Sequence, residues 1–150
     1  MSIKVESNKV SSAVDDILNQ YTADIHYGIR EVTDEKAEKL KKLIQEGAPV
    51  NKRKSKRRGT YKRSWKVKVE EDSFSTYEKK ICSPREYRLT HLLEKGHKAP
   101  RGGKHVEAQP HIKPAADKIE VEYVKGIEKI VQTSKQYGGG RRNTTKSYKR

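Results

Sequence analysis

Residues 87–114 read YRLTHLLEKGHKAPRGGKHVEAQPHIKP, and the chain on either side is arranged around this stretch. Aromatic, apolar and histidine side chains alternate over its first part, at Tyr87, Leu89, His91 and Leu93. The alternation predicts a third strand, or a short transition from helix to strand, over 85–94. Gly96 interrupts this segment, and a basic loop rich in Gly and Pro runs over 95–109. Pro110 and Pro114 then frame a rigid entry to a helix, since proline suits the first helical position.

An apolar stripe with helical spacing precedes this stretch. Its members stand three and four residues apart between Val10 and Ile44, which predicts one long helix over about 10–46. Residues 32–34 would instead end one helix and cap another if the stripe were broken there. A narrow stripe on so long a helix is expected to pack on the chain's own sheet, on a neighbouring subunit, or on both.

Between the long helix and the opening stretch, short runs alternate in polarity. Trp65, Val67 and Val69 face one way and predict core positions of a half-buried strand over 64–70. A second strand is expected over 74–82. With 85–94 these strands predict a small antiparallel sheet of about three strands over 64–94, because the connections are too short for crossovers.

A second apolar stripe follows the opening stretch. Ile119, Tyr123 and Ile127 predict the core face of a helix over 114–136, which Gly138 to Gly140 would end. The whole is expected to be a single α+β domain over 1–137, followed by a flexible basic tail over 138–150.

Charge is concentrated in two tracts. The chain has 150 residues, 31% hydrophobic, with a net charge of +15. Residues 51–68 hold ten basic residues and 135–150 hold six, neither with an acid, which leaves nineteen basic against twenty acidic residues elsewhere. The tracts 51–68 and 135–150 predict contacts with an acidic partner or with DNA, the plain alternative being solvated charge. The residues expected there are Lys52, Arg53, Lys54, Lys56, Arg57, Arg58, Lys62, Arg63, Arg141, Arg142, Lys149 and Arg150.

Little in the sequence points to a metal, a cofactor or catalysis. Cys82 is the only cysteine, so no internal disulfide forms, which fits a reducing compartment. His91 and His97 are six residues apart, and so are His105 and His111. With no cysteine pair beside them, this spacing is unlike that of the ligands of a structural zinc site. Pairs such as Glu94 with His97 lack an orienting third group. The chain also has no apolar run near 18 residues, so we expect no membrane-spanning helix.

Nucleic-acid binding is the main alternative to a protein-binding function. Lys62 and Arg63 stand between Tyr61 and Trp65, as in sites where bases stack on aromatic rings. Trp65 alternates in phase with the valines that follow, so we expect its ring to be buried. Any binding by the tracts 51–68 and 135–150 would then be sequence-independent contact with phosphates.

Three motifs in this stretch resemble the tail-completion or head–tail joining proteins of long-tailed phages, also called minor tail components. They are YRLTHLLEKGH, a basic Gly-containing loop, and V-x-A-x-PHI-x-PA. GTYKRSWKVK over 59–68 resembles that family's Gly-x-x-x-Arg-Ser-hydrophobic segment, and Pro49-Val50 resembles the end of its first helix. The resemblance spans roughly 10–133. The basic insertion at 51–58 and the tail after Tyr137 depart from the family pattern.

The resemblance implies a non-enzymatic virion protein of the α+β class, without cofactors, assembled in the host cytoplasm. It implies a homo-oligomeric ring, sixfold or alternatively twelvefold, at the interface of head and tail. Its partners would be the neck or connector on one side and the tail terminator or tail tube on the other, with DNA passing transiently through the lumen. The residues expected at the ring or partner interface are Tyr87, His91, Leu93, Glu94, Gly96, His97, Arg101, His105, Pro110, His111 and Pro114.

Overall fold

A single long helix forms the axis of the molecule. The computed structural model describes residues 7–50, 56–73, 75–99 and 102–136. Helix α1 (Ser7–Gly47) has 41 residues and is about 60 Å long at 1.5 Å per residue. The helix predicted over 10–46 is therefore confirmed, and it continues without a break through 32–34.

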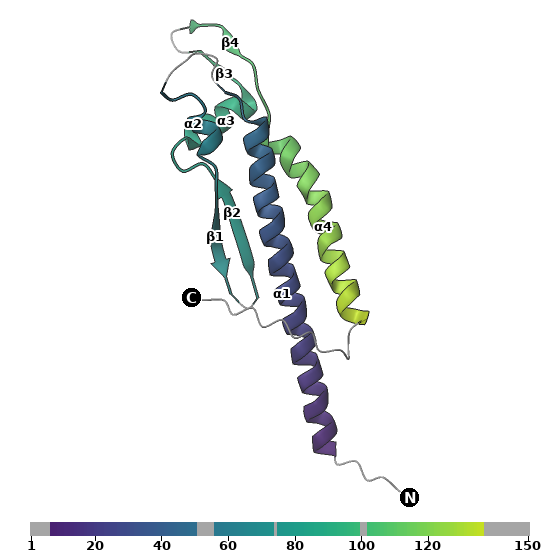
Figure 1. Cartoon of the computed structure of the whole chain (residues 1–150). Coiled ribbons are helices and arrows are strands. Elements are labelled where there is room, and N and C mark those ends of the chain that lie inside the picture. Colours follow the sequence, from purple (N-terminus) through teal and green to yellow (C-terminus); the bar gives the residue numbers. More distant parts are fainter. Residues whose placement is uncertain (1–6, 51–55, 74, 100–101, 137–150) are drawn as a thin grey trace, which may run out of the picture.

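The axis helix is the middle of three layers. Figure 1 shows α1 lying between a two-stranded ribbon on one side and helix α4 (Ile112–Gln136) on the other. The ribbon consists of β1 (Lys66–Asp72) and β2 (Tyr77–Cys82), which pair antiparallel. The predicted α+β class, with a long first helix, a small antiparallel sheet and a last helix, is confirmed.

The core lies at one end of the ribbon, where α1 ends and α4 begins. It is formed by Ile44, Ala48, Tyr61, Trp65 and Ala115, which are all buried. Half-buried side chains pack around it, at Leu40, Leu43, Ile81, Leu93 and Ile112. The burial of Trp65 follows the prediction.

The other predicted core positions are buried to different degrees. Ile119 is buried, whereas Val67, Tyr123 and Ile127 are half-buried. Val69 is 52% exposed, so its prediction as a core residue is wrong. The register of the ribbon shifts between Val69 and Glu71, and this part of β1 lies away from the core that surrounds Trp65.

The third strand predicted within 64–94 is also wrong. Residues 87–95 form helix α3 (Tyr87–Lys95), so β1 pairs with β2 alone in its sheet. The helix brings Leu93 against the core and half-buries Glu94, whereas Tyr87 and Leu89 of the alternating pattern remain exposed. Leu89, Leu92 and Leu93 have the three- and four-residue spacing of a helix, and this spacing prevails over the alternation.

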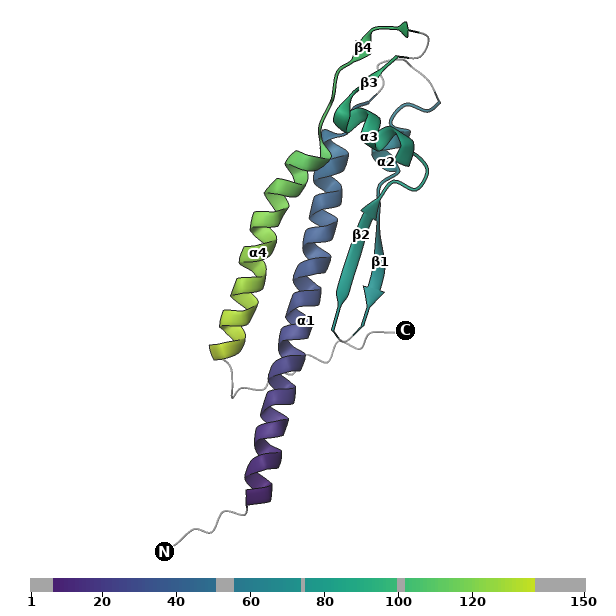
Figure 2. The ribbon, with the colours of Figure 1, turned by 180° about the vertical axis from the view of Figure 1, so that it is seen from behind.

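Two short elements were not predicted. Helix α2 (Thr60–Arg63) is a single turn after the basic loop. Within the predicted loop 95–109, β3 (His97–Lys98) pairs antiparallel with β4 (His105–Val106). Figure 2 shows this hairpin at the end of the molecule opposite the N-terminus of α1.

Two glycines hold α1 and α4 close together. A Cβ atom at Gly28 of α1 would lie 2.7 Å from Cγ2 of Ile130 on α4. A Cβ atom at Gly126 of α4 would lie 2.8 Å from Cγ1 of Val32 on α1. At each glycine, a branched side chain of the other helix occupies the space that the Cβ atom of a larger residue would fill. Glycine costs a helix roughly 1 kcal/mol relative to alanine, and the close approach of the helices explains why it is present here.

Candidate assembly interface

A carboxylate fixes the start of α4. Oε1 of Glu94, at the end of α3, accepts the backbone N–H of His111 at 2.7 Å and that of Ile112 at 2.8 Å. The first N–H groups of a helix have no partner within it, so Glu94 caps α4 from outside. Burial alone raises the pKa of the Glu94 carboxyl, but the backbone N–H groups of His111, Ile112 and Lys113 outweigh it, and the pKa lies below its ordinary value.

His111 connects this cap to the core. His111 is 5% exposed, and its ring Nδ1 lies 3.0 Å from the carbonyl oxygen of Gln109 and 3.1 Å from Oε1 of Glu94. Because Nδ1 faces two acceptors, it carries a proton and donates. Nε2 lies 2.9 Å from the hydroxyl of Tyr61 and accepts a hydrogen bond from it when the ring is neutral. Both ring nitrogens of His111 are therefore bonded within one subunit.

Three rings meet at this corner. Tyr61 contacts both Trp65 and His111 edge to face, with ring centroids 5.8 and 5.6 Å apart. Burial raises the pKa of the Tyr61 phenol, and the nearby Glu94 charge adds to the effect, whereas a hydrogen bond with Thr90 lowers it. Since Tyr61 and Trp65 are both buried, their rings serve the core and are not exposed for bases to stack on.

The hairpin β3–β4 leaves this corner through Gly96. Gly96 has a φ of 72°, and a Cβ atom there would lie 2.7 Å from the carbonyl oxygen of Val106. The returning chain is held where the N–H of Gln109 donates to the carbonyl of Leu93 at 2.6 Å. Residues 102–110 are all exposed. The hairpin therefore has a fixed base and a solvent-exposed tip.

Basic side chains gather at the same end of the molecule. Lys56, Arg57 and Arg58 are exposed, and their segment lies beside the hairpin end in Figure 1. The guanidinium of Arg63 donates to the carbonyl of Arg58 at 3.1 Å, which closes the turn before α2. Lys62 of α2 is half-buried. The predicted contacts Lys52, Arg53, Lys54, Arg141, Arg142, Lys149 and Arg150 lie outside the described residues, as does Arg101.

The residues predicted for the interface fall into two groups. Leu93, Glu94, Gly96 and His111 come together in the corner, where their contacts are internal to the subunit. Exposed positions form the second group: Tyr87, His91, His105, Pro110 and Pro114. His97 is half-buried, and its Nδ1 has no partner within the described residues. Sequence reasoning named Glu94 but not its capping role, because the contact joins residues seventeen positions apart.

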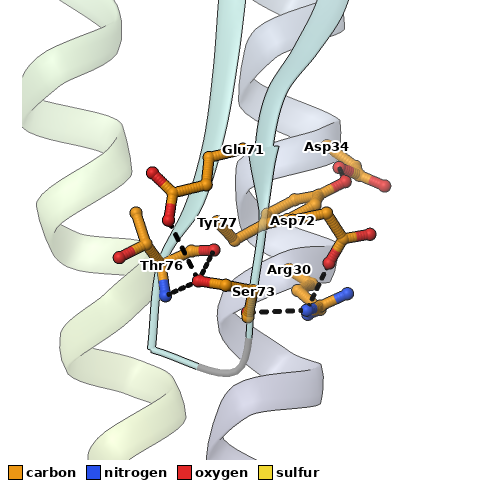
Figure 3. Close-up of polar contacts among 7 residues, drawn as sticks. All are labelled: Arg30, Asp34, Glu71, Asp72, Ser73, Thr76 and Tyr77. Carbon is orange, nitrogen blue, oxygen red and sulfur yellow. Dashed lines mark hydrogen bonds and ion pairs between the residues drawn. The ribbon is translucent and has the colours of Figure 1, made fainter.

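At its other end the ribbon is fastened to α1 by charged groups (Figure 3). The guanidinium of Arg30 lies 2.5 Å from the carboxylate of Asp72 and donates to the carbonyl of Ser73 at 3.1 Å. Asp34 accepts from the hydroxyl of Tyr77 at 2.7 Å and pairs with Lys79 at 2.6 Å. Burial, together with the hydrogen bond and charge of Asp34, raises the pKa of the Tyr77 phenol. These contacts fix the direction of the ribbon along α1.

Beyond the ribbon, α1 extends away from the body (Figures 1 and 2). Val14, Ile17 and Leu18 are 48%, 56% and 55% exposed on this extension. A patch of large apolar side chains on a solvent-facing helix is typical of a protein interface. The sequence pattern that predicted contact with a neighbouring subunit thus corresponds to a surface that the described part of the chain leaves open.

Chemical sites and membrane spans were also considered within the described residues. No group of three or more His, Cys, Asp or Glu side chains is arranged there to hold a metal ion. Neither long helix carries an apolar stretch sufficient to cross a bilayer.

Comparison with known proteins identifies the family. Residues 12–96 match the family model described as "Bacteriophage HK97-gp10, putative tail-component". The match runs from α1 through the ribbon to α3 and leaves out the hairpin and α4. The comparisons with curated proteins and with solved structures found no match. Since the matched region is more than half of the chain, the protein belongs to the HK97 gp10-like family of bacteriophage tail components.

Proposed function

We propose that this protein forms a ring at the head-proximal end of a phage tail. The ring joins the neck or connector to the tail tube or tail terminator, and DNA passes through its lumen. Sixfold symmetry matches a tail tube, and twelvefold symmetry, the alternative, matches a portal. Membership of a family of structural tail components supports the proposal and favours a non-enzymatic role.

The observation that carries the proposal is the presence of projecting elements at opposite ends of one molecule. The N-terminal part of α1 leaves the body at one end, and the hairpin β3–β4 stands at the other. A subunit that joins two structures needs a contact surface toward each. The base of the hairpin is fixed by Gly96 and by the Gln109–Leu93 hydrogen bond, which holds the exposed residues 102–106 at this end of the molecule.

Removal of the protein from a phage tests this role. Virions assembled without it are expected to separate into DNA-filled heads and complete tails of normal length in electron micrographs. Purified protein added to such a mixture is expected to restore joined particles. Normal joined virions without the protein, or tails of abnormal length, would contradict a joining role.

Binding of nucleic acid remains a second candidate function. Lys56, Arg57 and Arg58 are exposed next to the hairpin end, where they are available to phosphates. Since the rings of Tyr61 and Trp65 are buried, contact would be electrostatic and independent of sequence. Tight binding to duplex DNA that weakens steeply with salt would favour this function. A ring that conducts DNA needs only weak contact, so the joining role predicts weak binding at physiological salt.

A further inference from the structure

The two long helices lie side by side in opposite directions and advance residue for residue. A Cβ atom at Gly28 of α1 would meet Ile130 of α4. A Cβ atom at Gly126 of α4 would meet Val32 of α1, so four residues along one helix match four along the other. Continued at this pace, the last residue of α4 is level with Thr22. In both ribbon views α1 extends beyond the end of α4 (Figures 1 and 2).

The exposed stripe of α1 belongs to the face that α4 covers further along. Eighteen residues make five complete turns of an α-helix, so positions eighteen apart share a face. Val14 stands eighteen residues before Val32, and Leu18 stands eighteen before Lys36. Both Val32 and Lys36 contact α4. A chain that continues the course of α4 therefore passes over Val14 and Leu18, which are 48% and 55% exposed.

This part of α1 is acidic although the protein is strongly basic. Residues 10–29 contain three aspartates and no Lys or Arg, in a chain with a net charge of +15. Asp15 is exposed and lies on the side of α4, since it stands eighteen residues before Thr33, whose hydroxyl lies 3.2 Å from that of Tyr123. Asp24 is level with the last turn of α4, which carries a lysine. Asp15 stands seven residues beyond the end of α4, or about 10 Å.

The sequence that follows α4 is basic. Residues 137–150 lie outside the described residues. They contain five basic residues and no acid: Arg141, Arg142, Lys146, Lys149 and Arg150. Arg141 comes five residues after the end of α4, and five residues span up to about 16 Å when extended. This length is sufficient to bring the first two arginines to the carboxylate of Asp15.

The second basic tract is at the wrong end of the molecule for this site. Lys56, Arg57 and Arg58 lie beside the hairpin, opposite the projecting part of α1 (Figure 1). Contact with them requires a second copy, whereas the tail is joined to the helix that ends next to the stripe. A short tether holds its segment at an effective concentration on the order of millimolar. The tail of the same chain is therefore the favoured occupant.

We propose that the C-terminal tail, residues 137–150, docks on the exposed stripe of its own subunit. Its arginines pair with the carboxylate of Asp15, and its two tyrosines supply apolar rings that cover Val14 and Leu18. The acidic partner expected for this basic tract is then the protein's own first helix. The surface that this end of the molecule offers to other proteins consists of α1 and the tail together. The contact lies within one subunit and does not depend on the proposed ring.

Disulfide formation tests the contact in the full-length chain. Two variants carry Cys82→Ser, which removes the only cysteine, and Asn143→Cys in the tail. The stripe variant adds Leu18→Cys, and the control variant adds Gln20→Cys. Gln20 is exposed and nearer to the end of α4, but it stands eighteen residues before the exposed Glu38, away from the α4 side. Under mild oxidation the stripe variant is expected to close an intramolecular disulfide about tenfold faster than the control, because docking concentrates its two thiols. Non-reducing gels separate the closed monomer from the open one.

Charge reversal shows whether Asp15 holds the tail. Asp15→Lys in the stripe variant is expected to slow the disulfide to the rate of the control. Further replacement by Arg141→Glu and Arg142→Glu is expected to restore the fast rate, since the charges are then exchanged. Asp16→Lys is the matched change on the face toward the ribbon, eighteen residues before Asp34. It is expected to leave the rate close to that of the stripe variant at physiological salt, which screens distant charges.

Three outcomes would overturn the docking. Equal rates in the stripe and control variants would mean that the tail has no preferred position on α1. Disulfide-linked dimers in place of closed monomers would mean that the tail lies on another copy. A rate that Asp15→Lys leaves unchanged would mean that charge does not select the tail. The joining role is tested separately, by virions that lack the protein, and none of these results decides it.

Discussion

Glu94 is a single residue on which the path of the chain depends. It accepts two backbone N–H groups at the start of α4 from a position at the end of α3, seventeen residues earlier in the sequence. The start of α4 is thereby fixed relative to α3 by one carboxylate. Its side chain is 18% exposed, so solvent screens these bonds only in part.

Replacement of Glu94 by Gln is expected to lower the free energy of unfolding at pH 7 by about 1–2 kcal/mol, the range for loss of a charged cap. The pKa of Glu94 is lowered in the folded protein. Its stabilising effect is therefore complete above the pKa of an unfolded glutamate, about 4.3, and is lost as pH falls through the lower folded pKa. The free energies of unfolding of the wild type and the Glu94→Gln variant, measured with urea, should become equal as the pH is lowered. Glu107→Gln, at an exposed position, serves as the control.

Gly96 is the second residue that the corner requires. Gly96→Ala is expected to cost at least about 2 kcal/mol, since it combines a positive φ with a clash against backbone atoms. Gly102→Ala is the matched control, because Gly102 has a similar φ of 71° but nothing within 4 Å of the added Cβ. Thermal unfolding measures both. Equal losses in the two variants would mean that the contact with Val106 is unimportant.

At the scale of elements, the two long helices were predictable because their apolar stripes persist over many turns. The third strand was not, since nine residues are too few to separate alternation from helical spacing. Val69 alternates correctly along β1, but a two-stranded ribbon does not bury its whole length. The cap on α4 depends on a contact distant in sequence, and no local pattern marks it.

The packing of α1 on α4 gives a prediction at this scale. Gly28→Ala would gain roughly 1 kcal/mol of helix propensity, but its Cβ lies within 3.3 Å of three atoms of Ile130. Overpacking costs about 1–3 kcal/mol, so a net loss of about 1 kcal/mol is expected in chemical denaturation. Combination with Ile130→Ala should show a favourable coupling energy. Independent effects of the two changes would contradict the contact.

At the scale of the whole molecule, the projecting part of α1 is separable from the fold. A chain lacking residues 1–20 is expected to unfold within a few degrees of the full-length monomer, because Val14, Ile17 and Leu18 contribute little buried surface to the subunit. It is also expected to be absent from rings and unable to join heads to tails. Differential scanning calorimetry and complementation measure the two properties. A large loss of monomer stability would show that the segment belongs to the core.

The sequence predicted a phage tail component, and the family match confirms that level of description. It also placed basic charge in two tracts, of which residues 56–68 and 135–136 fall in the described chain. How the layers are arranged around α1 could not be read from periodicity, since a stripe shows which face is buried but not which element covers it. The two opposite ends of the molecule become visible only in three dimensions (Figure 1).

The paired glycines of α1 and α4 have a mechanical consequence. Gly28 receives Ile130 and Gly126 receives Val32, so the two contacts run in opposite senses across the helix pair. A slide of α1 toward its own N-terminus by one helical turn, about 5.4 Å, would bring the branched side chains of Ile130 and Val32 against each other. The contact between these side chains therefore opposes sliding of α1 along α4 in that direction. A force that pulls the N-terminal end of α1 is therefore transmitted to α4 and to the corner capped by Glu94, so that the three move together.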